Sequence, residues 1–171
     1  MQHDAWKTLR GSDLQVPSRC DGWTVGDVIE HTVGVTMKFA SFAAGATDSP
    51  HAPRVRLDPE APLVVVDEAR RAARAAWPTV DTARHCSLSF GAFSADAAAG
   101  INLFDVLAHT WDVTDALGLE LPASDKLWSS ALDAAEGVLG RGRDREHYES
   151  PRPVDSDAPI KLRFLSFLGR S

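Results

Sequence analysis

The residues of this sequence with the clearest chemical potential are Asp105, His109 and Asp112, which lie at positions i, i+4 and i+7. On an α-helix these spacings place the three side chains along one narrow stripe. The segment around them, residues 94–117, is apolar on nearly every side, which is typical of a helix buried inside a domain. Burying a carboxylate costs several kcal/mol unless it is paired, hydrogen-bonded or bound to a cation. A divalent metal ion would satisfy this stripe.

A third metal ligand should come from a second helix, and His31 is the best candidate. It lies between Val28 and Val35 in a segment of helical period, at the edge of the apolar seam. Imidazole and carboxylate groups suit zinc, nickel, manganese or iron(II). The other histidines lie near a terminus, in expected loops or in an edge segment, and we expect them to be solvated: His3, His51, His85 and His147.

A purely structural interpretation of the same residues stays open at this point. A histidine on an apolar face is often a core residue whose hydrogen bonds are satisfied. Asp105 could cap a neighbouring helix, and Asp112 could accept the indole proton of a tryptophan. Spacing alone does not decide between the two interpretations, because i, i+4 pairs are frequent by chance.

Helices must position these residues, and their ends are marked in the sequence. Thr24 with Asp27 resembles a capping box that starts a helix reaching Ala44, and Gly45 offers a stop. Ser94 caps the helix that carries the polar stripe, and Gly118 ends it. Further helices are expected over residues 63–77, 124–140 and 158–168, a short extended segment at 86–90, and loops at 47–62 and 141–157.

Length and composition limit the classes of partner. The 171 residues predict one domain over residues 1–171, with the 44% hydrophobic and 25% charged residues of an ordinary globular protein. A formal net charge of −6 argues against a nucleic-acid partner, because no basic surplus exists to neutralise phosphates. No run approaches the roughly 18 apolar residues of a membrane span, and the first ten residues lack the apolar core of a secretory signal. We therefore expect a cytoplasmic protein without a membrane or nucleic-acid partner.

The two cysteines fit that location. Cys20 and Cys86 show no CxxC spacing, and two cysteines in an intracellular chain of this size are usually free and reduced. Either thiol could touch a ligand, but we expect both to be small, buried apolar side chains.

Three ordered motifs resemble a known family. Residues 17–31, PSRCDGWTVGDVIEH, resemble the stretch P-x-x-C-x-x-W-T-V-x-D-L-x-x-H of the mycothiol-dependent maleylpyruvate isomerase-like group. This group is a metal-binding family within the DinB/YfiT-like superfamily. Residues 105–113, DVLAHTWDV, are similar to its second motif, and residues 164–170, FLSFLGR, are similar to a terminal segment of one branch.

The resemblance implies an all-α fold: a DinB/YfiT-like four-helix bundle, here with a shortened first helix and a short C-terminal helix. It implies that His31, Asp105 and His109 are the ligands of a divalent metal, expected to be zinc. The thiol-using isomerases tend to have Glu where this chain has Asp105. Because Asp is shorter by one methylene, we expect the metal to sit closer to that helix.

The resemblance further implies an enzyme of the low-molecular-weight thiol S-transferase or isomerase type, with mycothiol as cosubstrate and a small electrophile as substrate. We expect Asp112 to orient a ligand or a bound water, and Trp111 to pack around the site or line its pocket. No separate general base is evident. The short segment before residue 17 is consistent with a homodimer in which a partner chain completes the bundle.

Two other functions remain open from the sequence. One is a thiol-independent hydrolase, lyase or cyclase of specialised metabolism that uses the metal or Asp/His acid–base chemistry. The other is a non-catalytic bundle that binds a metal or ligand as a sensor or partner protein. A fold does not by itself decide between such functions.

Overall fold

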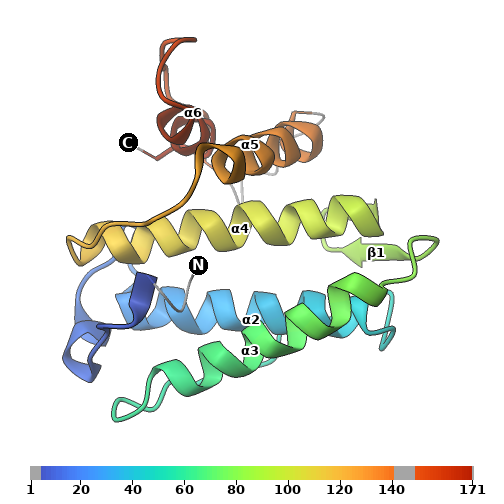
Figure 1. Cartoon of the computed structure of the whole chain (residues 1–171), viewed down its shortest axis with the longest axis horizontal. Coiled ribbons are helices and arrows are strands. Elements are labelled where there is room, and N and C mark those ends of the chain that lie inside the picture. The colour runs from blue at the N-terminus through green and yellow to red at the C-terminus, as the bar shows by residue number, and fades with distance from the viewer. Residues whose placement is uncertain (1–4, 141–148, 171) are drawn as a thin grey trace. The chain divides into compact units, whose positions relative to one another are not determined.

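The computed structural model describes residues 5–140 and 149–170, and the chain divides into two compact units, Met1–Pro122 and Ala123–Ser171. We describe each unit by itself (Figure 1). The expectation of one domain over residues 1–171 therefore stays a prediction.

The first unit is built on three helices of 14 to 22 residues, and the second on two helices of 15 and 8 residues. In the first unit α2 packs against both α3 and α4. In chain order its elements are the 3-10 helix η1 (Gly11–Gln15), α2 (Val25–Ala43), α3 (Leu63–Ala76), the 3-10 helix η2 (Trp77–Thr79), β1 (His85–Leu88), β2 (Gly91–Ser94) and α4 (Ala95–Ala116). The predicted all-α class is confirmed, because the only sheet within the described ranges 5–140 and 149–170 is a two-stranded one.

The start of α2 is the capping box that the sequence predicts. Thr24 Oγ1 accepts a hydrogen bond from the Asp27 N–H at 3.2 Å, and Asp27 Oδ2 accepts from the Thr24 N–H at 2.9 Å. These bonds satisfy two of the backbone donors that a helix start leaves unpaired. Gly45, with φ of +88°, follows the end of the helix in the left-handed conformation that glycine adopts without steric cost. His31 thus lies within a helix whose two ends are both fixed.

The helix α4 follows directly from a β-hairpin. Ser94 Oγ accepts from the Ala97 N–H at 3.2 Å and caps the helix, as predicted, and Gly118 ends it with φ of +63°. The sequence predicts only a short extended segment at 86–90, whereas β1 and β2 pair antiparallel in a register that joins His85 to Ser94. The turn between them places the Phe90 and Phe93 rings 5.3 Å apart. Strands of four residues give too short an alternation to be recognised by periodicity.

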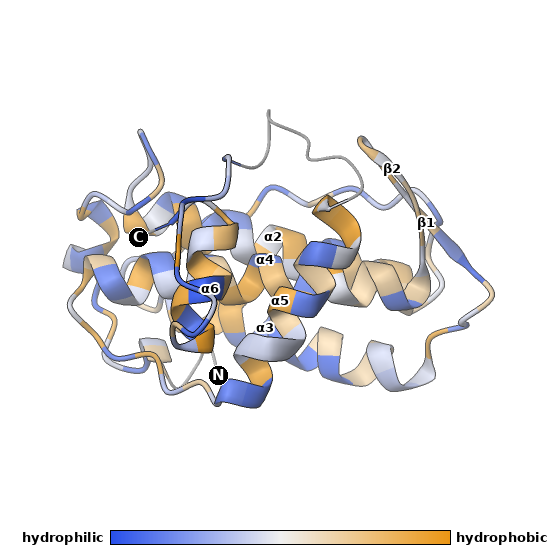
Figure 2. Ribbon diagram, turned by 90° about the horizontal axis from the view of Figure 1, so that it is seen from above, coloured by the Kyte–Doolittle hydropathy of each residue, from blue (hydrophilic) through white to orange (hydrophobic). Residues whose placement is uncertain are grey.

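The core of the first unit lies along α2 and α4. Its large, fully buried side chains include Trp6, Phe39, Phe42, Phe104 and Leu107. Four buried threonines also lie on these helices, and each hydroxyl donates to a carbonyl of the preceding turn of its own helix: Thr32, Thr36, Thr110 and Thr114. Figure 2 shows that each helix carries both apolar and hydrophilic residues, as expected for helices with one buried face.

The second unit contains α5 (Asp125–Leu139) and α6 (Ile160–Phe167), which pack against each other through Trp128 and Phe164, with ring centroids 5.5 Å apart. Ser124 caps α5 by accepting from the Leu127 N–H at 3.3 Å, at the start of the helix that the sequence predicts over residues 124–140. The predicted loop at 141–157 is seen over residues 149–157, and residues 141–148 lie outside the described residues.

The sequence predicts one or two helical turns over residues 4–9, of which residue 4 lies outside the described residues and residues 7–9 are not helical. Ala5 and Trp6 are helical and buried. His3 and His147 also lie outside the described residues, so their predicted exposure stays a prediction. None of the described helices is both long and apolar enough to cross a membrane.

Candidate metal centre

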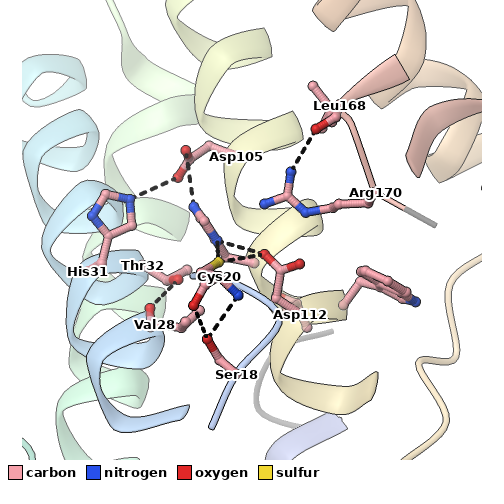
Figure 3. Close-up of polar contacts among 12 residues, drawn as sticks. Ser18, Cys20, Val28, His31, Thr32, Asp105, Asp112, Leu168 and Arg170 are labelled. Carbon is pink, nitrogen blue, oxygen red and sulfur yellow. Dashed lines mark hydrogen bonds and ion pairs between the residues drawn. The ribbon is translucent and has the colours of Figure 1, made fainter. Parts of the chain in front are cut away.

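The structure brings His31 of α2 together with Asp105 and His109 of α4 (Figure 3). Each residue offers one ligand atom, and these atoms all lie within 4.8 Å of one another. His31 Nε2 is 4.0 Å from Asp105 Oδ2, and His109 Nε2 is 3.8 Å from Asp105 Oδ1. Ligand atoms around a tetrahedral zinc ion lie roughly 3.3 Å apart. The three side chains are therefore spaced for a cation and too far apart for hydrogen bonds to one another.

The carboxylate of Asp105 gives the clearest indication that this group of residues can bind a cation. Its Oδ2 atom is buried and has no hydrogen-bond partner among the described residues. A buried carboxylate oxygen without a hydrogen bond costs free energy that a bound cation would recover. The two facing imidazoles and this carboxylate fit a divalent transition metal, whose preferred ligands they are.

The ring of His109 is held by a second aspartate. His109 Nδ1 lies 2.9 Å from Asp112 Oδ2, and Asp112 is completely buried. A carboxylate accepts hydrogen bonds only, so the proton is on Nδ1 and Nε2 faces Asp105. A carboxylate behind a histidine in this way is a common means of orienting a metal ligand.

Cys20 joins this group, contrary to the expectation of an inert apolar side chain. The thiol is half-buried, and Sγ lies 3.3 Å from Asp112 Oδ2 and 3.8 Å from His109 Nδ1. Cys86 is buried, as expected. The spacing of Cys20 from Asp112, 92 positions along the chain, carries no signal of this contact. The one sequence feature that could have drawn attention to Cys20 is its place in the motif at residues 17–31.

Electrostatics separate the two histidines. Burial lowers the pKa of His109, but the charge of Asp105 and the hydrogen bonds of Asp112 and Cys20 outweigh burial and raise this pKa from 6.5 to about 10. The pKa of His31 is lowered, because burial disfavours its charged form more than the Asp105 carboxylate favours it. Without a metal, the α4 imidazole is therefore the one that holds a proton.

An open groove leads to the His31 side of the centre. It has a volume of about 480 Å³, and its wall includes His31, Trp23 and the segment 52–56. The His31 side chain is 36% exposed, compared with 15% for His109. Trp23, itself 39% exposed, meets the His31 ring edge-on at 5.2 Å. A small molecule would reach the centre from this side.

The remaining predicted residues are the histidines outside the centre and Trp111. His51 and His85 are exposed, as expected. Trp111 is buried on α4, two positions beyond His109, and residues two apart leave a helix on different faces. Its expected part in lining the pocket stays a prediction.

Comparisons with known proteins agree with the motifs. Two curated proteins of Mycobacterium tuberculosis, the uncharacterized protein MT0763 of strain CDC 1551 and the uncharacterized protein Rv0738 of strain H37Rv, are each 29% identical to this chain over 170 residues. The alignments cover 95% of this chain and 88% of each relative. No solved structure matches significantly.

The family comparison covers both helices of the centre. Residues 3–114 match the family described as the mycothiol maleylpyruvate isomerase N-terminal domain, a DinB-like family. The matched segment contains Cys20, all three proposed ligands and Asp112. The chain therefore belongs to the mycothiol maleylpyruvate isomerase N-terminal domain family.

Proposed function

We propose that this protein is a metal-dependent enzyme of the mycothiol S-transferase or isomerase type that acts on a small electrophilic substrate. His31, Asp105 and His109 would hold a divalent metal, expected to be zinc. The observation that carries the proposal is the Asp105 carboxylate, which lies between two imidazoles and whose buried Oδ2 atom has no hydrogen bond from any described residue. Membership of a mycothiol-related family supports the choice of cosubstrate.

The ligand set suits catalysis better than a structural role. Three protein ligands leave a coordination position open, whereas structural zinc sites use four. When bound, the metal would lower the pKa of a thiol that reaches this position, so that a thiolate forms near neutral pH. The groove beside His31 gives a thiol and an electrophile a route to it.

The chain's own residues would hold and orient the reactants. Asp112 fixes the ring of His109 through Nδ1, so that Nε2 points toward Asp105. His31 and Trp23 form the wall of the groove next to the centre, where an apolar face of a substrate could pack on the indole. The thiol gives its proton to solvent, and its sulfur forms a bond to the electrophilic carbon. In a transferase a leaving group departs, and in an isomerase the thiol departs after the rearrangement.

The first test is the metal content of purified, tag-free protein, measured by mass spectrometry. We expect near-stoichiometric divalent metal in the wild type, and its loss in Asp105→Asn, which keeps the shape of the side chain and removes its charge. His85→Ala is the matched control, because His85 is exposed on β1. Wild-type protein that holds no metal even after reconstitution with zinc would overturn the proposal.

The second test separates the thiol-dependent reaction from thiol-independent chemistry. The metal-loaded protein is incubated with a panel of small electrophiles, with and without mycothiol, and product formation is followed by mass spectrometry. We expect turnover that requires the thiol and is lost in Asp105→Asn. Turnover that is unchanged by mycothiol would contradict the thiol transfer and favour a hydrolase, lyase or cyclase.

A further inference from the structure

Cys20 is fixed in space by the loop that precedes α2. The Cys20 N–H donates to Ser18 Oγ at 3.0 Å, and the Trp23 N–H donates to the Cys20 carbonyl at 3.0 Å. The Ser18 N–H donates in turn to the Trp23 carbonyl at 2.9 Å, which closes the loop. Because the backbone of the loop is held in this way, the position of Cys20 Cα and the direction of its Cα–Cβ bond are set before any ligand binds.

The thiol points at the carboxylate that orients His109 (Figure 3). Asp112 Oδ2 lies 3.3 Å from Cys20 Sγ and 2.9 Å from His109 Nδ1. A carboxylate has no proton to give, so both neighbours are donors to the same oxygen. The thiol donates from the loop at one side, and the imidazole donates from α4 at the other.

We propose that Cys20 is a positioning residue for the metal centre. Its thiol fixes the carboxylate of Asp112 in the orientation that holds the proton of His109 on Nδ1. Nε2 of His109, the atom that would bind the metal, then points toward Asp105. The inference rests on the proposed metal for its consequence, but the effect of the thiol on the His109 ring exists in the metal-free protein.

The alternative is that Cys20, His109 and Asp112 are themselves ligands of a second metal, since their polar atoms also lie within 4.8 Å of one another. The spacing argues against it. The 2.9 Å between His109 Nδ1 and Asp112 Oδ2 is a hydrogen-bond distance, shorter than the roughly 3.3 Å that separates two ligand atoms on a tetrahedral zinc ion. The proton between these atoms occupies the place where a cation would have to lie.

The test compares Cys20→Ala, Cys20→Ser and the control Cys86→Ala in full-length protein. Zinc affinity is measured by competition with a chelator. We expect a loss of about tenfold in Cys20→Ala, in the range found when partners behind a metal ligand are removed. Cys20→Ser should retain most of the wild-type zinc affinity, because a hydroxyl donates to Asp112 as a thiol does. Cys86→Ala should bind zinc like the wild type.

Two further measurements exclude a general structural effect and a ligand role. Proton and nitrogen NMR of the metal-free proteins at neutral pH, where the raised pKa keeps both ring nitrogens of His109 protonated, reports the Nδ1–H hydrogen bond to Asp112. We expect one sharp Nδ1 proton signal in the wild type and in Cys20→Ser, but a shifted or broadened signal in Cys20→Ala. Cobalt(II) protein reports the ligands, and we expect no near-ultraviolet sulfur-to-cobalt absorption.

The outcomes separate the inference from the proposed function. Sulfur-to-cobalt absorption that disappears in Cys20→Ser would overturn the positioning role, because Cys20 would then be a ligand. Zinc affinity and a His109 Nδ1 proton signal that are the same in Cys20→Ala and Cys86→Ala would also overturn it. A wild type that binds no metal, combined with a His109 Nδ1 proton signal that changes in Cys20→Ala, would refute the proposed function and leave the positioning of His109 standing.

Discussion

The two histidines of the candidate metal centre lie in contrasting surroundings. His109 is enclosed on α4, where Asp112 and Cys20 contact its Nδ1 side and Asp105 faces its Nε2 side. His31 borders the open groove on α2, and its ring contacts are with Trp23 and with His109 itself, at centroid distances of 5.2 and 5.0 Å. One ligand is thus held by directional hydrogen bonds, and the other by ring packing alone as far as the described residues show.

This contrast shows how a small site can be both fixed and accessible. Hydrogen bonds to charged groups define the orientation of a ring, whereas aromatic edge contacts contribute less and tolerate rotation. The α4 side would therefore set the position of a bound cation, and the α2 side could adjust to a molecule that enters the groove. The pKa values follow the same division, raised for His109 and lowered for His31.

The largest difference should appear when each ring is removed. In metal-free protein we expect His109→Ala to lower the free energy of unfolding by about 3 kcal/mol, because buried aspartates lose a charged partner. His31→Ala should cost less than about 1 kcal/mol, because the ring is partly exposed. Urea unfolding of the two variants measures the difference, and equal losses would contradict the contrast.

The pH dependence of the metal-free protein should separate the two rings next. NMR titration should show His109 protonated well above neutral pH, with a pKa near 10, and His31 titrating below its usual 6.5. Between pH 6.5 and about 10, the folded protein retains the His109 proton whereas the unfolded chain has lost it. The stability that this proton contributes is fully present below pH 6.5 and disappears as the pH rises toward 10.

A variant without the imidazole provides the control for this dependence. His109→Gln should unfold with a free energy that changes less between neutral pH and pH 10 than that of the wild type. A pKa of His31 above that of His109 would contradict the contrast between the enclosed α4 side and the open α2 side.

A smaller effect is expected from Asp112→Asn. The amide can donate as well as accept, so the His109 ring loses its preference for one tautomer, and zinc affinity should fall about tenfold to a hundredfold. Asp96→Asn is the control, because Asp96 is exposed in the first turn of the same helix. Chelator competition measures both variants. An Asp112→Asn protein with wild-type affinity would show that the enclosed side does not depend on this hydrogen bond.

The smallest effect is expected from Trp23→Ala. Its indole contacts only the open side, so zinc affinity should change by less than about threefold while the ring of His31 gains mobility. Proton NMR linewidths of the His31 ring and the same chelator competition test this. A loss of affinity as large as that of Asp112→Asn would mean that both sides are fixed equally.

Local hydrogen bonding explains what could be predicted from the sequence. The caps at Thr24 and Ser94 and the stop at Gly45 depend on residues within one turn, so neighbouring residue types determine them. The grouping of Asp105 with His109 follows from the helical period in the same way. The addition of His31 needed the resemblance to the family as well, because periodicity does not say which helices are neighbours.

Contacts between distant segments explain what could not be predicted. The Cys20 thiol reaches Asp112 because the loop before α2 turns back toward α4, and this depends on backbone hydrogen bonds within that loop. A cysteine with an ordinary spacing carries no sign of such a contact. The hairpin of β1 and β2 likewise depends on pairing between two strands. Each strand has only four residues, which is too short for its sequence alone to indicate the pairing.

The distribution of the ligands over α2 and α4 has a consequence for the chain as a polymer. His31 and the pair Asp105 and His109 are separated in sequence by α3 and the hairpin. A cation bound to all three would join the ends of this long segment in the folded state, whereas the unfolded chain would first have to close a long loop to form the site. At a free metal concentration a hundred times the dissociation constant, mass action adds about 2.7 kcal/mol to the folded state. The lifetime of this protein against proteolysis would then follow the supply of free metal around it.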